Sequence, residues 1–137
     1  MSRALVVMRE HGTLYGLWAD NVNEVRADLR VTPLPRELSY FEGICNYKGN
    51  MIPVFSLSAI SGEKTEASGL LVIAEHEKNQ FALSISEVLD VTEDTADAMP
   101  AVNMELSKGV LFISEIIRLK EPVFVLDMEK ILAEICK

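Results

Sequence analysis

A chain of 137 residues with 49% hydrophobic residues can bury an ordinary core, so its length demands neither disulfides nor a structural metal. The formal net charge of −8, from 13 Lys+Arg against 21 Asp+Glu, disfavours partners with phosphate backbones or anionic lipid heads. No apolar run reaches membrane-spanning length and no secretory leader is evident, so we expect a cytoplasmic protein that binds neither nucleic acid nor a membrane directly.

Short apolar runs separated by turn residues follow one another along the chain, which predicts an all-β sandwich or barrel. The runs expected to form strands are 4–8, 14–18, 22–27, 51–55, 70–74, 81–85, 88–92, 110–113, 116–119 and 123–126. A C-terminal helix is predicted over 128–136, capped by Asp127, because apolar residues recur there at helical spacing. The pattern also allows a short helical piece around 56–60.

The chain repeats itself, and the repeat predicts a duplicated fold. The matched blocks are 15–28 with 81–94, Gly43 with Gly109, both 66 positions apart, and 53–57 with 122–126, 69 positions apart. We therefore predict one domain, 1–137, that contains barrel 1 over about 14–62 and barrel 2 over about 68–127. The strand 4–8 and the helix 128–136 flank the two barrels, and strands are free to cross between the halves.

Residues that would carry catalysis are scarce. His11 and His76 lie in polar, turn-like stretches, and no phosphate-binding glycine loop or nucleophile motif occurs. The acidic runs 63–66 and 92–97 are typical of a solvated face. Cys45 lies in a predicted buried strand, and with Cys136 it has no metal-ligand spacing. We expect no catalytic, cofactor or metal site, and a binding role ranks above an enzyme.

Residues 33–57 read as a hairpin with a cationic tip. Pro33 and Pro35 hold an extended approach and exclude a helix there. Gly43 allows a close turn into a strand. The run Lys48-Gly49-Asn50 suits a tight turn with positive φ angles, which predicts a β-hairpin around it.

This hairpin resembles the signature of CheW-like domains. The signature is a Leu-Pro approach, then Gly-Ile-x-Asn-x-Arg-Gly and Pro-Val-x-x-Leu, and here it falls on 34–35, 43–49 and 53–57. The resemblance extends over nearly the whole chain, through 15–25, 81–91 and 122–132. It implies a mainly β fold of two intertwined five-stranded β-barrels with a short C-terminal helix, which agrees with the repeat.

The resemblance also implies a function. Members of this family are non-catalytic scaffolds of bacterial chemotaxis, without cofactors, that couple the cytoplasmic tips of methyl-accepting chemoreceptors to the regulatory domain of the histidine kinase CheA. The residues that match partner-binding positions of the family are Val22, Glu24, Val25, Gly43, Asn46, Lys48 and Gly49. The kinase-facing surface cannot be assigned residue by residue in this way.

Three residues depart from the family pattern. Lys48 stands where Arg is usual and so loses planar, bidentate recognition of a carboxylate. Ser56 and Ser86 stand where Asp is usual. These departures suggest a divergent paralogue, which leaves an adaptor for another two-component pathway as an alternative. A second alternative is a double barrel that binds a small ligand or an oligonucleotide.

Each candidate residue also has a purely structural interpretation. Val22 and Val25 suit half-buried strand positions, and Glu24 alternates with them and should point outward. Lys48 would serve equally well as a solubilising charge at a hairpin tip. Trp18 and Phe41 are large apolar residues that would ordinarily lie in the core.

Overall fold

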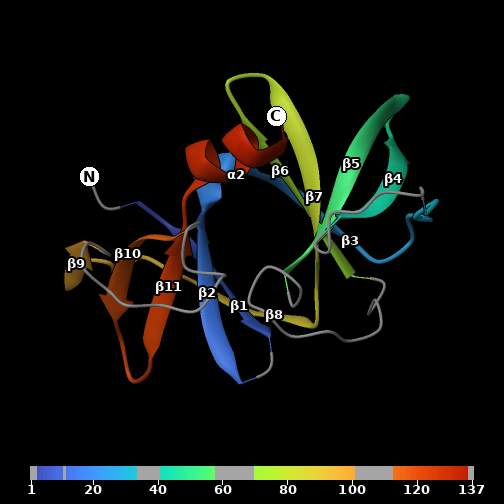
Figure 1. Cartoon of the computed structure of the whole chain (residues 1–137). Coiled ribbons are helices and arrows are strands. Elements are labelled where there is room, and N and C mark those ends of the chain that lie inside the picture. The colour runs from blue at the N-terminus through green and yellow to red at the C-terminus, as the bar shows by residue number, and fades with distance from the viewer. Residues whose placement is uncertain (1–2, 11, 34–40, 58–69, 101–112, 136–137) are drawn as a thin grey trace.

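The structure, a computed structural model, describes residues 3–10, 12–33, 41–57, 70–100 and 113–135 (Figure 1). It is mostly β, with two sheets and one C-terminal α-helix, as the sequence predicts. Sheet A has the strand order β8 (Glu87–Thr92), β1 (Leu5–Glu10), β2 (Thr13–Trp18), β11 (Pro122–Leu126), β10 (Ile113–Arg118) and β9 (Ala98–Pro100). Sheet B has the order β3 (Val22–Arg26), β6 (Leu70–His76), β7 (Asn79–Ile85), β5 (Asn50–Ser56) and β4 (Phe41–Tyr47).

Each sheet takes strands from both halves of the sequence repeat. Sheet A joins β1 and β2 to the later strands β8 to β11, whereas sheet B joins β6 and β7 to the earlier strands β3 to β5. Two parallel ladders make the connections, one between β11 and β2 and the other between β5 and β7. The two halves are therefore intertwined. The barrel bounds 14–62 and 68–127 stay a prediction about the sequence repeat, because the sheets do not follow them.

Both sheets curl so that their edges approach one another. In sheet A, β8 and β9 lie at opposite edges and yet only residues 93–97 separate them in sequence. In sheet B, Thr32 forms an isolated antiparallel bridge with Ile44 of the edge strand β4. Thr32 precedes Ala98, the first residue of β9, by 66 positions. The short β9 is therefore the counterpart of this bridge, and it makes the sixth strand of sheet A beyond the five that were expected.

The apolar core forms three layers, because strands such as β6 are buried on both faces. Val72 and Ala74 of β6 face a central cluster between the sheets, while Leu71 and Ile73 face a second cluster enclosed by sheet B. A third cluster is enclosed by sheet A. A strand buried on both faces reads as a continuous apolar run, which is how residues 70–74 appear in the sequence.

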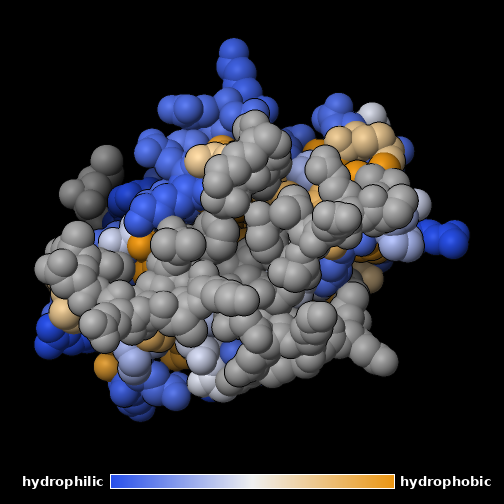
Figure 2. All heavy atoms as spheres, in the orientation of Figure 1, coloured by the Kyte–Doolittle hydropathy of each residue, from blue (hydrophilic) through white to orange (hydrophobic). Residues whose placement is uncertain are grey.

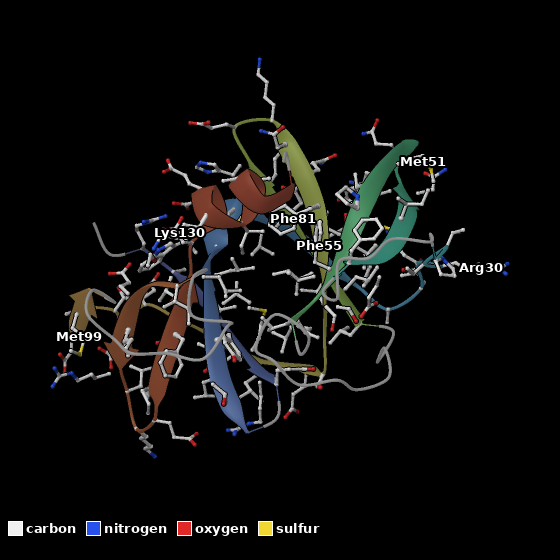
Figure 3. All side chains as sticks on the ribbon, viewed as in Figure 1. Arg30, Met51, Phe55, Phe81, Met99 and Lys130 are labelled. Carbon is white, nitrogen blue, oxygen red and sulfur yellow. The ribbon has the colours of Figure 1, made fainter. Side chains whose placement is uncertain are left out.

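Aromatic rings and the helix hold the central layer together. The rings of Phe55 and Phe81 come from β5 and β7, the parallel pair of sheet B. They pack edge to face with their centroids 6.1 Å apart (Figure 3). The helix α2 (Met128–Ile135) covers this layer with Met128 and Ile131 (Figure 1). Its predicted cap is confirmed, because Asp127 Oδ1 accepts the backbone N–H of Lys130 at 3.1 Å.

The remaining predicted elements differ at their ends. The expected strands 110–113 and 116–119 are joined in β10, which has an irregular register between Ile113 and Glu115; residues 110–112 lie outside the described residues. The helical piece allowed at 56–60 lies mostly outside them too. Trp18 and Phe41 are half-buried and pack against the core clusters. Within the described ranges no helix is long and apolar enough to cross a membrane.

Candidate functional site

The hairpin of β4 and β5 presents a cation at its tip, as predicted. Tyr47 pairs with Asn50 across a two-residue turn, in which Lys48 and Gly49 have φ angles of +50° and +89°. Two positive φ angles are the mark of a type I′ turn, whose twist matches that of the strands. Asn46 Oδ1 accepts the backbone N–H of Gly49 at 2.9 Å. Asn46 and Gly49 therefore shape the turn, and the Lys48 side chain, 67% exposed, projects from it.

The turn lies beside Glu24 because sheet B curls and brings its edge strands β3 and β4 together. The Tyr47 hydroxyl donates a hydrogen bond to Glu24 Oε2 at 2.6 Å. Lys48 Nζ lies 3.4 Å from the same oxygen, and Arg26 Nη1 donates to Glu24 Oε1 at 3.2 Å. These four residues, Glu24, Arg26, Tyr47 and Lys48, form what we name the Glu24 cluster. It joins the two edges of sheet B.

Hydrogen bonding dominates the electrostatics of the cluster. The bond from Tyr47 is the main cause that lowers the pKa of Glu24, and Lys48 and Arg26 act in the same direction against the effect of burial. The same carboxylate raises the pKa of Tyr47 and of Lys48. Lys48 Nζ also lies 5.4 Å from the centre of the Tyr47 ring. At neutral pH the cluster is thus an ionised carboxylate held by one hydroxyl and two cations.

A second carboxylate fixes Arg26 in this arrangement. Arg26 Nε and Nη2 donate to the two oxygens of Asp28 at 2.7 and 2.6 Å. This two-point contact orients the guanidinium, because its donors form a rigid, planar fork. Arg26 therefore supports Glu24 from a position set by Asp28. Neither residue was predicted from the sequence, although both follow Glu24 at alternating positions, Arg26 at the end of β3 and Asp28 two residues beyond it.

The other predicted site residues lie at the margins of the cluster. Val22 is half-buried and packs against the central core, which agrees with its structural interpretation. Val25 is 40% exposed and remains available to a partner. Gly43 lies further down β4 with a φ of +151°, and a Cβ there would come 2.1 Å from the carbonyl oxygen of Thr32. Gly43 therefore permits the bridge that closes sheet B.

A comparison with known proteins identifies the family. Residues 4–136 match the family model described as the CheW-like domain. The chain belongs to the CheW-like family. It is 27% identical to the chemotaxis protein CheW of Thermotoga maritima over 123 residues, which are 85% of this chain and 78% of the relative. It is 23% identical to a probable chemotaxis protein CheW of Rhizobium etli over 124 residues, 83% of this chain and 77% of the relative.

A solved structure has the same fold. The crystal structure of the scaffolding protein TtCheW from Thermoanaerobacter tengcongensis matches with a TM-score of 0.83 and 25% identity, over 93% of this chain and 90% of that one. The predicted fold is therefore confirmed. The predicted function is confirmed as that of a chemotaxis coupling scaffold of the CheW-like family, and the small-ligand or oligonucleotide alternative is not favoured.

The structure gives each departure from the CheW-like pattern a physical setting. Lys48 acts as a point charge on Glu24 and the Tyr47 ring, with no two-point contact. Ser56 is buried and, with Ser84, hydrogen-bonds the carboxyl of Glu42, whose pKa burial raises. Ser86 donates its backbone N–H to Glu10 at 2.6 Å, so its side chain is not the group that makes this contact.

The CheW-like hairpin carries an apolar residue that the sequence analysis did not select. Met51 pairs with Asn46 across the hairpin and is 58% exposed. Figure 3 shows it near the start of β5, close to the tip of the hairpin, and Figure 2 shows hydrophobic atoms over the same hairpin. Large exposed apolar side chains beside ordered charges are typical of protein interfaces. The signal in the sequence was weak, because Met51 reads as an ordinary strand residue.

The cysteine and histidine side chains that the structure describes have structural roles. Cys45 is buried in β4, and burial raises the pKa of its thiol, as in a core cysteine. His76 Nε2 lies 3.8 Å from Glu129 Oε1 at the start of α2. His11 and Cys136 lie outside the described residues. Among the residues that the structure describes, no three His, Cys, Asp or Glu side chains are grouped as metal ligands would be.

Proposed function

We propose that this CheW-like chain works in the cytoplasm without catalysis and couples chemoreceptor tips to the regulatory domain of CheA. The receptor binds at the Glu24 cluster, together with Val25 and the turn 46–49. The observation that carries the assignment is the contact of Glu24 with Tyr47 and Lys48 across the two edges of sheet B. That contact assembles the matched residues of two separate sequence motifs into one half-exposed surface.

The surface suits a partner that offers both apolar and acidic side chains. Val25 and Met51 are exposed apolar residues of β3 and β5, and they supply apolar contact area that is removed from water when a partner binds. Lys48 is mostly exposed, and its ammonium group has three donors, so it can also donate to a carboxylate of a receptor. Gly43 and Val22 contribute indirectly, because Gly43 permits sheet closure and Val22 anchors β3 in the core.

The test is co-sedimentation of the purified chain with receptor cytoplasmic fragments and with the CheA regulatory domain. Glu24→Lys and Lys48→Glu should each weaken receptor binding about tenfold or more, since each reversal places like charges together at the surface. Asp90→Lys is the matched control, because Asp90 lies 66 positions after Glu24 on the corresponding edge of sheet A. Circular dichroism verifies that all three variants fold.

Unchanged receptor binding after both reversals would remove the Glu24 cluster from the receptor site. Equal losses in the two reversals and in Asp90→Lys would show that the loss of binding is not specific to the Glu24 cluster. Absence of any binding by the unaltered chain, to either protein, would contradict the proposed partners. Kinase binding that survives both reversals would show that the kinase uses a different surface.

A further inference from the structure

The edge strand β8 of sheet A corresponds to β3 of sheet B, and the two share an irregularity of the backbone. In β3 one extra residue, Asn23, lies between Val22 and Glu24, which pair with the adjacent residues Ala74 and Ile73. In β8 one extra residue, Leu89, lies between Val88 and Asp90, which pair with the adjacent residues Met8 and Val7. Both strands thus carry a β-bulge at positions 66 apart.

The bulged side chains of the two strands differ. Asn23 Nδ2 donates to Glu75 Oε1 at 3.1 Å, so the bulge of β3 is tied to the neighbouring strand. Leu89 at the bulge of β8 is 43% exposed, and Val91 two residues later is 55% exposed. Two large apolar side chains therefore stand in solvent on one edge strand. Such pairs are costly to leave in water and mark contact sites.

The charged residues within β8 and the segment that follows it are all acidic. Residues 87–97 contain five acidic residues and no Lys or Arg. Arg9 Nε lies 3.8 Å from Glu87 Oε1, and Arg118 Nε lies 3.9 Å from Asp97 Oδ1. No cation of the described residues lies within ion-pair distance of the remaining three acids, Asp90, Glu93 and Asp94. Glu24, the counterpart of Asp90, has two cations and a hydroxyl.

The edge of β8 is blunted against the addition of another strand. Asp90 Oδ1 accepts the backbone N–H of Val91 at 2.7 Å, so one outward donor is already satisfied by the neighbouring side chain. The bulge at Leu89 also breaks the regular spacing that a pairing strand needs. A partner of β8 must therefore bind through side chains.

We propose that β8 and the following residues 93–97 dock a segment of a partner protein in which apolar side chains are flanked by Lys or Arg. The apolar residues cover Leu89 and Val91, and the cations pair with Asp90, Glu93 and Asp94. Charge complementarity decides the occupant, because a second copy of this acidic strand would bring like charges together. This surface belongs to sheet A, apart from the Glu24 cluster, and so adds a site to the proposed function.

The test uses two synthetic peptides, one that alternates Leu with Lys and a matched one that alternates Leu with Glu. Binding to the full chain is followed by backbone amide NMR at low and at physiological salt. The Lys peptide should shift the amides of 87–94, and its affinity should fall with salt. L89S/V91S should weaken this binding about tenfold or more, whereas V25S, at the position that corresponds to Val91, should change it less than twofold.

A second variant separates charge from apolar contact. D90N/E93Q/D94N keeps Leu89 and Val91, and it should weaken binding of the Lys peptide while leaving sheet A folded. Equal binding of the two peptides, or amide shifts spread evenly over the surface, would overturn the proposal. A wild-type dimer in sedimentation that L89S/V91S abolishes would also overturn it, in favour of a second copy as the occupant. L89S/V91S should co-sediment with receptor fragments as the wild type does. A failure of the β8 proposal would therefore not count against receptor binding at the Glu24 cluster.

Discussion

β3 and β8 occupy the same place in two sheets built on one sequence repeat, and they present different surfaces. β3 carries Glu24, whose charge is held by Tyr47, Lys48 and Arg26. β8 carries Asp90, whose carboxylate bonds only a backbone N–H of its own strand among the interactions described, beside the exposed Leu89. One edge is ordered by its own chain, while the other leaves its charges and apolar groups to a partner.

The interiors of the two sheets have diverged much less than their edges. Leu5 and Leu71, 66 positions apart, are both fully buried, each in the cluster enclosed by its own sheet. Tyr15 and Phe81 both face the central cluster. Close packing therefore constrains the buried residues of both repeats, whereas the exposed residues of the edge strands can differ and serve separate binding roles.

The largest expected effect is that of Gly43→Ala, which tests how sheet B is closed. A Cβ at this position meets the Thr32 carbonyl oxygen, so we expect a loss of about 4 kcal/mol in the free energy of unfolding. Gly12→Ala is the control in the turn between β1 and β2. Gly12 also has a positive φ, but a Cβ there would meet no atom of the described residues within 4 Å, so the variant should lose only about 1–2 kcal/mol. Urea denaturation measures both, and equal losses would contradict the closure.

The next effect compares the two interiors directly. Leu5→Ala and Leu71→Ala should each cost about 2–5 kcal/mol, because each removes a fully buried side chain from one enclosed cluster. The denaturation midpoints of the two variants should fall together. A large loss in one variant with almost none in the other would mean that one sheet dominates stability.

A smaller effect concerns acid stability and Glu24. Because its folded-state pKa is lowered, the ionised carboxylate stabilises the fold above its ordinary pKa of about 4.5, and this stabilisation is lost as pH falls through the folded-state pKa. Glu24→Gln removes that dependence, so its denaturation midpoint should decline less steeply than that of the wild type below pH 4.5. Parallel curves for the two proteins would show that the cluster does not hold the charge.

The smallest effect isolates one hydrogen bond. Tyr47→Phe removes the hydroxyl that is the main cause of the lowered pKa of Glu24, so that pKa should rise toward its ordinary value. Carboxyl-carbon NMR titration measures the pKa directly. The variant should fold normally, because the ring of Tyr47 remains in the core of sheet B. An unaltered pKa would assign the effect to Lys48 and Arg26 instead.

Local signals in the sequence predicted most of the fold. The turn 48–50 and the cap Asp127 depend on neighbouring residues, and both are found in the structure. The 66-position offset of the repeat recurs in the bulges of β3 and β8. The three-residue β9 escaped notice because no periodicity can be read from so short a strand. The crossing of strands between the halves was allowed by the repeat but not determined by it, since pairing partners depend on the whole sheet.

The candidate site was only partly predictable for the same reason. Glu24 and Lys48 were found by motif, but Tyr47 joins them only because sheet B closes and brings β3 beside β4. In the sequence, Tyr47 alternates with the buried Cys45 and reads as core. Leu89 likewise reads as a core residue of an apolar strand, but in the structure it lies at the bulge of β8 and is exposed.

We propose that the receptor binds the edge of sheet B at the Glu24 cluster. The most direct test is backbone amide NMR of the full chain, titrated with a chemoreceptor cytoplasmic-tip fragment. We predict that the amides of 22–26 and 46–49 shift first and most strongly, and that those of 87–92 stay in place. Shifts confined to 87–92, with 22–26 and 46–49 unmoved, would contradict it.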